Sequence, residues 1–256
     1  MNDPPIVKLR SAIERLYSIF SRYSLPEHHL AGCPHCVSDT DHGRLFSAPL
    51  RYLGPQEIGR FAFKTMTTWG GVDGFRHFLP RIFELLASDG GGHWIDPEVA
   101  FGKFCYANWR TWPDDEQEAV VGFFESLWSN VLDHFPNEFD ADACLCCIGQ
   151  AVDDLTSFLE AWRISESLPS AKHFASFVEH NTSGSKRARS RGWALQNLWW
   201  KDRIVPASQV VQWLIDPART VELERAFFAF GADAADAGEL SQALENLVYL
   251  QSIDGL

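Results

Sequence analysis

Apolar side chains recur with helical spacing along most of the chain. Between residues 117 and 135, eight apolar side chains follow i, i+3, i+4, i+7 order and would form one wide helix face. The same spacing recurs over 6–23 and 72–87, and again within 152–162 and 240–248. Alternating runs rich in β-branched residues are nearly absent. The pattern therefore predicts an all-α protein of about ten helices with little or no sheet.

Helix starts fall where a capping side chain or a proline precedes an apolar face. Asp96 stands before Pro97, which places a carboxylate at the N-cap and a proline at the first helical position. Asp236 and Glu239 have the spacing of a capping box. Helices of about 10–20 residues suit antiparallel pairs, so we expect an irregular helical array or bundle. HEAT-like stacking would be one form of it, although the sequence shows no fixed repeat.

One polar, basic segment, residues 181–192, interrupts the helical pattern. It predicts a main helical domain over 1–180 and a smaller C-terminal helical unit over 193–256 that packs on the first. Four cations of this loop, followed by Trp193, would suit phosphate or single-stranded nucleic acid. A solvated loop is the simpler interpretation, because the chain as a whole is acidic.

The charge is concentrated in one part of the chain. The net charge is −12, and residues 96–160 hold 14 acidic and two basic side chains. Such a region repels nucleic acid and anionic membranes and favours a basic partner. No apolar run reaches the roughly 18–20 residues of a membrane-spanning helix. The first five residues also lack the basic and apolar regions of a signal peptide, so we expect a cytoplasmic protein.

Residues 28–42 form a loop that concentrates thiol and imidazole side chains. Zinc takes four nitrogen or sulfur ligands, and a CxxC turn presents two thiolates on one side of the ion. The predicted structural zinc site consists of His29, Cys33, Cys36 and His42. Redox-active thiols, or small buried cysteines without a metal, are the alternatives. A thioredoxin-like site is disfavoured, since it would need a βαβ context that this chain lacks.

The segment from Gly32 to Cys36 reads Gly-Cys-Pro-His-Cys and precedes an acidic helical body. In this respect the chain resembles uncharacterised bacterial all-helical proteins that carry a Gly-Cys-Pro-x-Cys segment. The resemblance implies an all-helical fold and implies no activity.

Common catalytic motifs are absent, including HExxH, GxSxG and the Walker A loop. We therefore expect a non-enzymatic protein that binds a basic protein partner, for example an immunity or antitoxin-type inhibitor of a basic effector. The alternative is a metal- or thiol-dependent enzyme that uses Cys33 and Cys36. The residues expected to contact the partner are acidic or aromatic side chains between 109 and 125: Asp114, Asp115, Glu116, Glu118, Glu125, Trp109 and Trp112.

Overall fold

The computed structural model describes residues 3–25, 30–89, 94–182 and 195–254. Within these ranges it contains twelve α-helices, three short 3-10 helices and no β-strand. Two isolated bridges, Gly32 with Trp69 and Thr65 with Trp69, are the sheet-like pairings of this part of the chain. The predicted all-α class is confirmed.

The contacts divide the chain into two compact units, residues 1–127 and 128–256. This division differs from the predicted boundary at 181–192. The helices on either side of that segment, α9 (Leu168–Thr182) and α13 (Ala234–Asp254), pack against each other, so their apolar faces share one core. Residues 183–194, which include the four cations and Trp193, lie outside the described residues.

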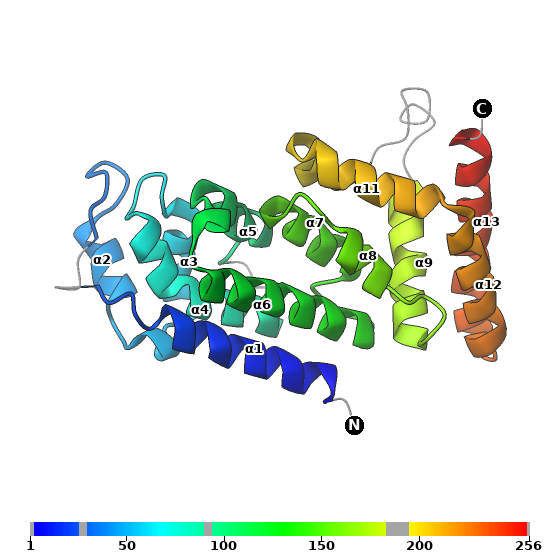
Figure 1. Cartoon of the computed structure of the whole chain (residues 1–256), viewed down its shortest axis with the longest axis horizontal. Helices are drawn as coiled ribbons and strands as arrows, with labels where there is room; N and C mark the ends of the chain where they lie inside the picture. The colour runs from blue at the N-terminus through cyan, green and yellow to red at the C-terminus, as the bar shows by residue number, and fades with distance from the viewer. Residues whose placement is uncertain (1–2, 26–29, 90–93, 183–194, 255–256) are drawn as a thin grey trace. The chain divides into compact units, whose positions relative to one another are not determined.

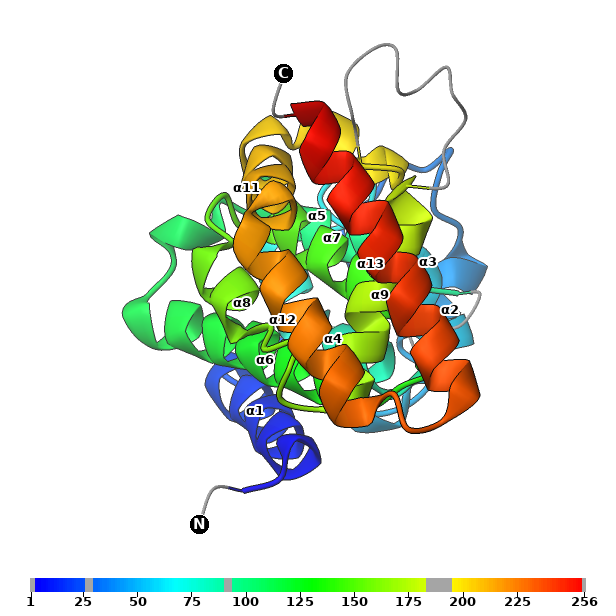
Figure 2. The same ribbon diagram turned by 90° about the vertical axis from the view of Figure 1, so that its right-hand side faces the viewer.

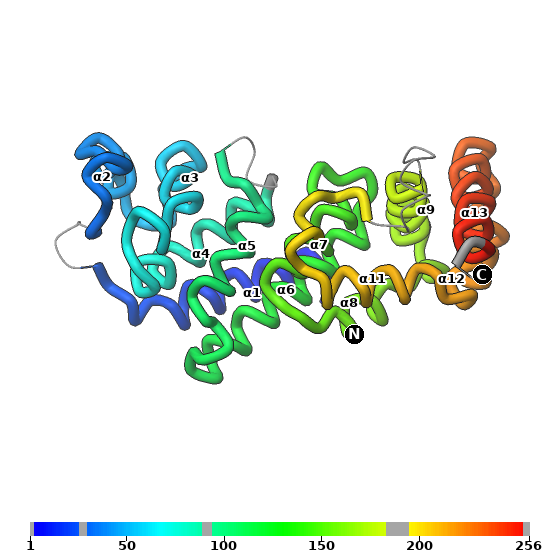
Figure 3. Tube along the Cα trace, turned by 90° about the horizontal axis from the view of Figure 1, so that it is seen from above, coloured from blue at the N-terminus to red at the C-terminus, as the bar shows by residue number. Residues whose placement is uncertain are grey.

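The N-terminal unit is a set of helices around an aromatic core. Its elements are α1 (Pro5–Phe20), α2 (Asp39–Leu45), η2 (Leu50–Tyr52), α3 (Pro55–Lys64), α4 (Val72–Asp89), α5 (Pro97–Tyr106), η3 (Trp109–Thr111) and the first part of α6 (Asp114–Asp133). Helix α1 packs on α4, and α3 contacts α2, α4 and α5 (Figure 1). Figure 3 shows α2 and α3 side by side. This pair positions the cysteine turn described below.

The C-terminal unit contains the rest of α6 and seven further elements. These are α7 (Ala141–Ala151), α8 (Thr156–Ala161), α9, η4 (Leu198–Asp202), α11 (Ile204–Ile215), α12 (Pro217–Phe230) and α13. Figure 2 shows α12 and α13 as neighbours joined by a short turn, and α13 also packs on α9. The rings of Trp128 and Trp213 lie 5.2 and 5.3 Å from that of Trp162 in its core. No helix among the described residues is long and apolar enough to cross a membrane.

Two predicted helix starts illustrate what local sequence decides. Asp96 caps α5, because its Oδ1 accepts a hydrogen bond from the Val99 N–H at 2.9 Å. The predicted capping box at Asp236 is wrong. Asp233 caps α13 instead, accepting from the Ala235 N–H at 2.8 Å, and Asp236 forms an ion pair with Lys172. An aspartate three residues earlier fits the turn, so the helix starts there.

Candidate functional site

Cys33 and Cys36 lie on one tight turn that leads into α2. The N–H groups of Cys36 and Val37 both donate to the Cys33 carbonyl oxygen at 2.9 Å. Both thiols are partly exposed. The backbone N–H groups of His35 and Cys36 and the Cys36 thiol donate hydrogen bonds to the Cys33 sulfur. These contacts, together with the positive charge of Lys64, lower the pKa of the Cys33 thiol although desolvation opposes them.

The loop 64–70 supports this turn from behind. The Cys33 N–H donates to the Thr68 carbonyl oxygen at 2.8 Å. Nearby, the Thr65 carbonyl oxygen accepts a hydrogen bond from the Lys103 Nζ at 2.9 Å. Lys103 is only 3% exposed, and burial lowers the pKa of its ammonium group. A buried amine that donates to a loop carbonyl restricts how far that loop can move.

Two cations of α3 hold the other end of the turn. The Cys36 carbonyl oxygen accepts from the Arg60 Nη2 at 3.1 Å and from the Lys64 Nζ at 2.9 Å. The Arg60 Nε also lies 3.0 Å from the Asp41 Oδ1. The Asp41 carboxylate in turn accepts from the Ser38 N–H at 2.9 Å in the capping box of α2. The cysteine turn is thus tied to both α2 and α3.

Three of the four predicted zinc ligands belong to the described residues, and His29 lies outside them. The His42 ring packs edge-on against Trp69, with ring centroids 5.2 Å apart. In the described part of the chain, no group of three or more His, Cys, Asp or Glu side chains is arranged to hold a metal ion. The zinc site with Cys33, Cys36, His29 and His42 stays a prediction.

The predicted partner-binding acids of α6 occupy different environments. Three of them are exposed: Asp114, Glu118 and Glu125. Glu118 forms an ion pair with Arg15 of α1 at 2.9 Å, and Asp115 forms one with Arg22. Cations of α1 therefore partly neutralise the acidic face that the sequence suggested.

Glu116 does not belong to an exposed face. Its side chain is fully buried, and its Oε1 accepts a hydrogen bond from the Tyr23 hydroxyl at 2.5 Å. The Arg76 Nε lies 3.5 Å from Oε2, and the Arg22 Nη1 lies 3.7 Å from Oε1. A partner would not reach this carboxylate, because hydroxyl and guanidinium groups of the same unit surround it. Its position corrects the expectation that Glu116 contacts a partner.

Trp109 and Trp112 are also inside the N-terminal unit, being 2% and 4% exposed. The Trp112 indole N–H donates to the Ala107 carbonyl oxygen at 3.0 Å. Both rings lie within about 6 Å of the Phe104 ring, at 5.7 and 6.0 Å between centroids. The expectation that these tryptophans form an interface is corrected by this burial: they are core residues that lie at a turn.

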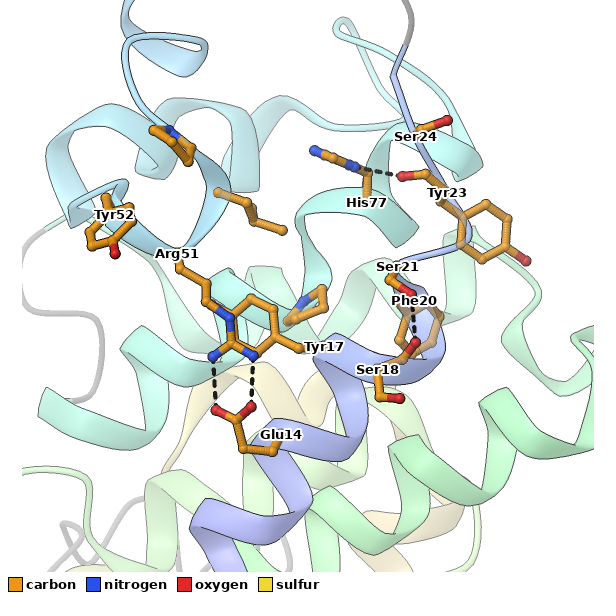
Figure 4. Close-up of a pocket in the computed structure, with 13 residues that line it drawn as sticks. Glu14, Tyr17, Ser18, Phe20, Ser21, Tyr23, Ser24, Arg51, Tyr52 and His77 are labelled. Atoms are coloured by element: carbon orange, nitrogen blue, oxygen red, sulfur yellow. Dashed lines mark hydrogen bonds and ion pairs between the residues drawn. The ribbon is translucent and has the colours of Figure 1, made fainter.

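A cavity of about 550 Å³ lies beside α1, η2 and α4 (Figure 4). Arg51 donates two hydrogen bonds to Glu14, at 2.8 and 2.6 Å, and its guanidinium lies 3.7 Å from the centre of the Tyr17 ring. On the other side, the His77 Nδ1 lies 2.6 Å from the Tyr23 carbonyl oxygen. The strongest charges of this cavity therefore neutralise each other, and we assign it no chemistry.

A second cavity of the N-terminal unit, of about 700 Å³, adjoins the cysteine turn. Arg60 and Lys64 line it and also bind the Cys36 carbonyl, while Arg44 of α2 adds a third cation. Sequence analysis missed these groups. Their one local signal is the i, i+4 spacing of Arg60 and Lys64, which places both on one face of a helix.

Three further cysteines, Cys144, Cys146 and Cys147, are fully buried in α7. Burial raises the pKa of the Cys144 thiol well above its usual range, and the charge of Asp140 adds to the effect. Buried thiols of this kind are small packing groups rather than nucleophiles.

Comparisons with protein-family models, curated proteins and solved structures gave no match to this chain. The chemistry must therefore be argued from the geometry itself. Among the described residues, the Cys33–Cys36 turn combines partly exposed thiols, donors to one sulfur and adjacent cations. Such an arrangement can stabilise a thiolate and exchange it with a disulfide.

Proposed function

We propose that the N-terminal unit is a thiol–disulfide exchange site in which Cys33 attacks and Cys36 resolves. The observation that supports this most strongly is the placement of two partly exposed thiols on one turn, with the Cys36 thiol donating to the Cys33 sulfur. The two sulfurs are thus adjacent, as an intramolecular exchange requires. Backbone N–H groups directed at the Cys33 sulfur favour its thiolate form.

The exchange consumes one disulfide substrate, which is the oxidant. The Cys33 thiolate attacks one sulfur, the substrate S–S bond breaks, and the first thiol leaves after taking a proton. Cys36 then loses its proton and attacks the Cys33 sulfur, which releases the second thiol and leaves a Cys33–Cys36 disulfide. A low-molecular-weight thiol returns the pair to its reduced form by the reverse exchange. We infer a cytoplasmic location, where such thiols keep the pair reduced at rest.

Reaction with 4,4′-dithiodipyridine, a neutral chromogenic disulfide, tests this proposal. Reduced wild-type protein should show a fast phase that releases two thiopyridones, one from each step. Cys33→Ser should lose this phase and react at least about tenfold more slowly, because the remaining thiols lack the donors around Cys33. Cys36→Ser should release one thiopyridone and retain the other as a mixed disulfide.

Cys105→Ser is the matched control, since Cys105 is an exposed cysteine in the same unit. It should leave the fast phase unchanged. A fast phase that survives in Cys33→Ser, or that disappears in Cys105→Ser, would contradict the assignment of Cys33 as the attacking group.

We retain binding of a basic protein as a second candidate, because three acids of α6 share one exposed stripe. Asp114, Glu118 and Glu125 are separated by four and seven residues, which places them on the same helix face. In this candidate the protein is a bacterial immunity or antitoxin-type inhibitor, and the stripe steers a basic effector toward it.

Reversing the stripe tests the second candidate. A basic protein retained from native lysate at low salt should be lost from the Asp114→Lys, Glu118→Lys, Glu125→Lys triple variant. A triple replacement of the remote exposed acids Asp3, Asp39 and Asp73 is the control and should retain it. Retention of the same protein by the α6 variant, or capture of no basic protein by wild type, rules out binding through the stripe.

A further inference from the structure

The cavity next to the cysteine turn has an uneven distribution of charge. It is lined by α2, α3 and the start of α5: Asp41, Arg44, Gln56, Gly59, Arg60, Phe63, Lys64, Trp94, Ile95, Asp96 and Pro97. Both of its acids are engaged by the protein itself. Asp41 pairs with Arg60 and caps α2, and Asp96 caps α5. Among the described residues, no carboxylate lies within 4.0 Å of the charged groups of Arg44 or Lys64. The cavity therefore presents two cations that lack an anion.

Two aromatic side chains add apolar surface to the same cavity. Phe63 is 58% exposed and Trp94 is 54% exposed, which is unusual for large apolar groups in a core rich in aromatic rings. Gly59 fixes the position of the second ring. A Cβ at Gly59 would lie 2.2 Å from the Trp94 carbonyl oxygen, so glycine lets the Trp94 backbone lie directly on α3. Cations beside exposed rings suit a ligand that is both anionic and partly apolar.

The cavity and the thiols share two side chains. Arg60 and Lys64 line the cavity and also donate to the Cys36 carbonyl oxygen, at 3.1 and 2.9 Å. A carboxylate bound by Arg44 and Lys64 would therefore lie close to the cysteine turn. Binding energy at such a site would raise the local concentration of a disulfide next to Cys33.

We propose that this cavity selects anionic disulfides: it binds a carboxylate of the substrate through Arg44 and Lys64, places its apolar part against Phe63 and Trp94, and presents the S–S bond to Cys33. The proposal rests on the thiol–disulfide function and adds the class of substrate. The exchange itself is the two-step reaction described above, with the anionic disulfide as oxidant and its two thiols as products.

Two chromogenic disulfides of different charge test the selection. The probes are 5,5′-dithiobis(2-nitrobenzoate), which carries two carboxylates, and the neutral 4,4′-dithiodipyridine. Arg44→Gln should slow the reaction of Cys33 with the dianionic probe about threefold to tenfold and leave the rate with the neutral probe unchanged. Added salt should reduce the difference between wild type and variant, because Arg44 is exposed and its attraction is screened.

Arg44 is the appropriate position for this substitution, since Arg60 and Lys64 also hold the cysteine turn. Arg10→Gln, at an exposed arginine of α1 outside the cavity, is the matched control and should change neither rate. Trp94→Ala should slow the dianionic aromatic probe more than it slows cystamine, a cationic disulfide without a ring.

The two proposals fail in different ways. If the neutral probe reacts rapidly with Cys33 but Arg44→Gln leaves the dianionic rate unchanged, the selection of anions is overturned and the exchange site stands. Equal slowing of both probes in Arg44→Gln would also overturn it, because the substitution would then act on the turn rather than on the ligand. If the neutral probe reacts equally with wild type and Cys33→Ser, the exchange site itself is overturned.

Discussion

Replacing Glu116 by alanine should lower the free energy of unfolding of the N-terminal unit by about 3–5 kcal/mol. The carboxylate is fully buried, and it accepts a hydrogen bond from Tyr23 and faces Arg76 and Arg22. The guanidinium of Arg76 is itself mostly buried, with 15% of the side chain exposed. Removing the acid leaves this cation desolvated without a counter-charge, which costs more than the lost hydrogen bonds alone.

Glu118→Ala is the matched control two residues further along α6. Glu118 also pairs with an arginine of α1, at 2.9 Å, but the side chains are 48% and 68% exposed. Exposed pairs contribute about 0–1 kcal/mol, so this variant should be close to wild type. Urea unfolding followed by hydrogen exchange of α5 and α6 amides measures both. Equal losses in the two variants would mean that Glu116 is hydrated rather than buried.

Phe104→Ala should cost a similar amount, about 3–5 kcal/mol, in the same unit. The ring is 1% exposed. Five aromatic rings surround it with centroids 5.1–6.0 Å away: Phe75, Phe83, Trp109, Trp112 and Phe124. Truncation removes contacts with all of them and leaves a cavity that rigid rings cannot easily fill.

Phe63→Ala is the control for this substitution, because it removes the same side chain from an exposed position of α3. We expect a change within about 0.5 kcal/mol, as for most surface substitutions. Unfolding in urea, monitored by the near-ultraviolet signal of the buried tryptophans, compares the two. A loss in Phe104→Ala no larger than that in Phe63→Ala would contradict the position of Phe104 at the centre of the core.

Local sequence patterns predicted the helices well. Apolar spacing predicted a helix over 72–87 and another over 117–135, and the structure has α4 at Val72–Asp89 and α6 at Asp114–Asp133. Burial of individual residues was harder to predict. Trp109 and Trp112 lie at a turn, where exposure is common, but the rings that cover them come from α4, α5 and α6. Such contacts depend on how helices pack, which a single sequence does not show.

The candidate site was predicted in part. The CxxC spacing alone identified Cys33 and Cys36 as the residues with chemistry to offer. The groups around them come from further along the chain: Arg60 and Lys64 lie 24 and 28 residues beyond Cys36, and Lys103 acts through the carbonyl of Thr65. Packing of α2 on α3 brings these groups together, so spacing in the sequence gave no sign of them.

The reversible disulfide between Cys33 and Cys36 is tested most directly by mass spectrometry of the full chain equilibrated in glutathione buffers of graded redox potential. After alkylation of free thiols, the peptide with both cysteines should lose two hydrogens and take up no alkyl group in oxidising buffer. In reducing buffer it should carry two alkyl groups, while Cys105 is alkylated throughout. Alkylation of Cys33 and Cys36 at every potential, or their protection at every potential as in a zinc site, would contradict the exchange function.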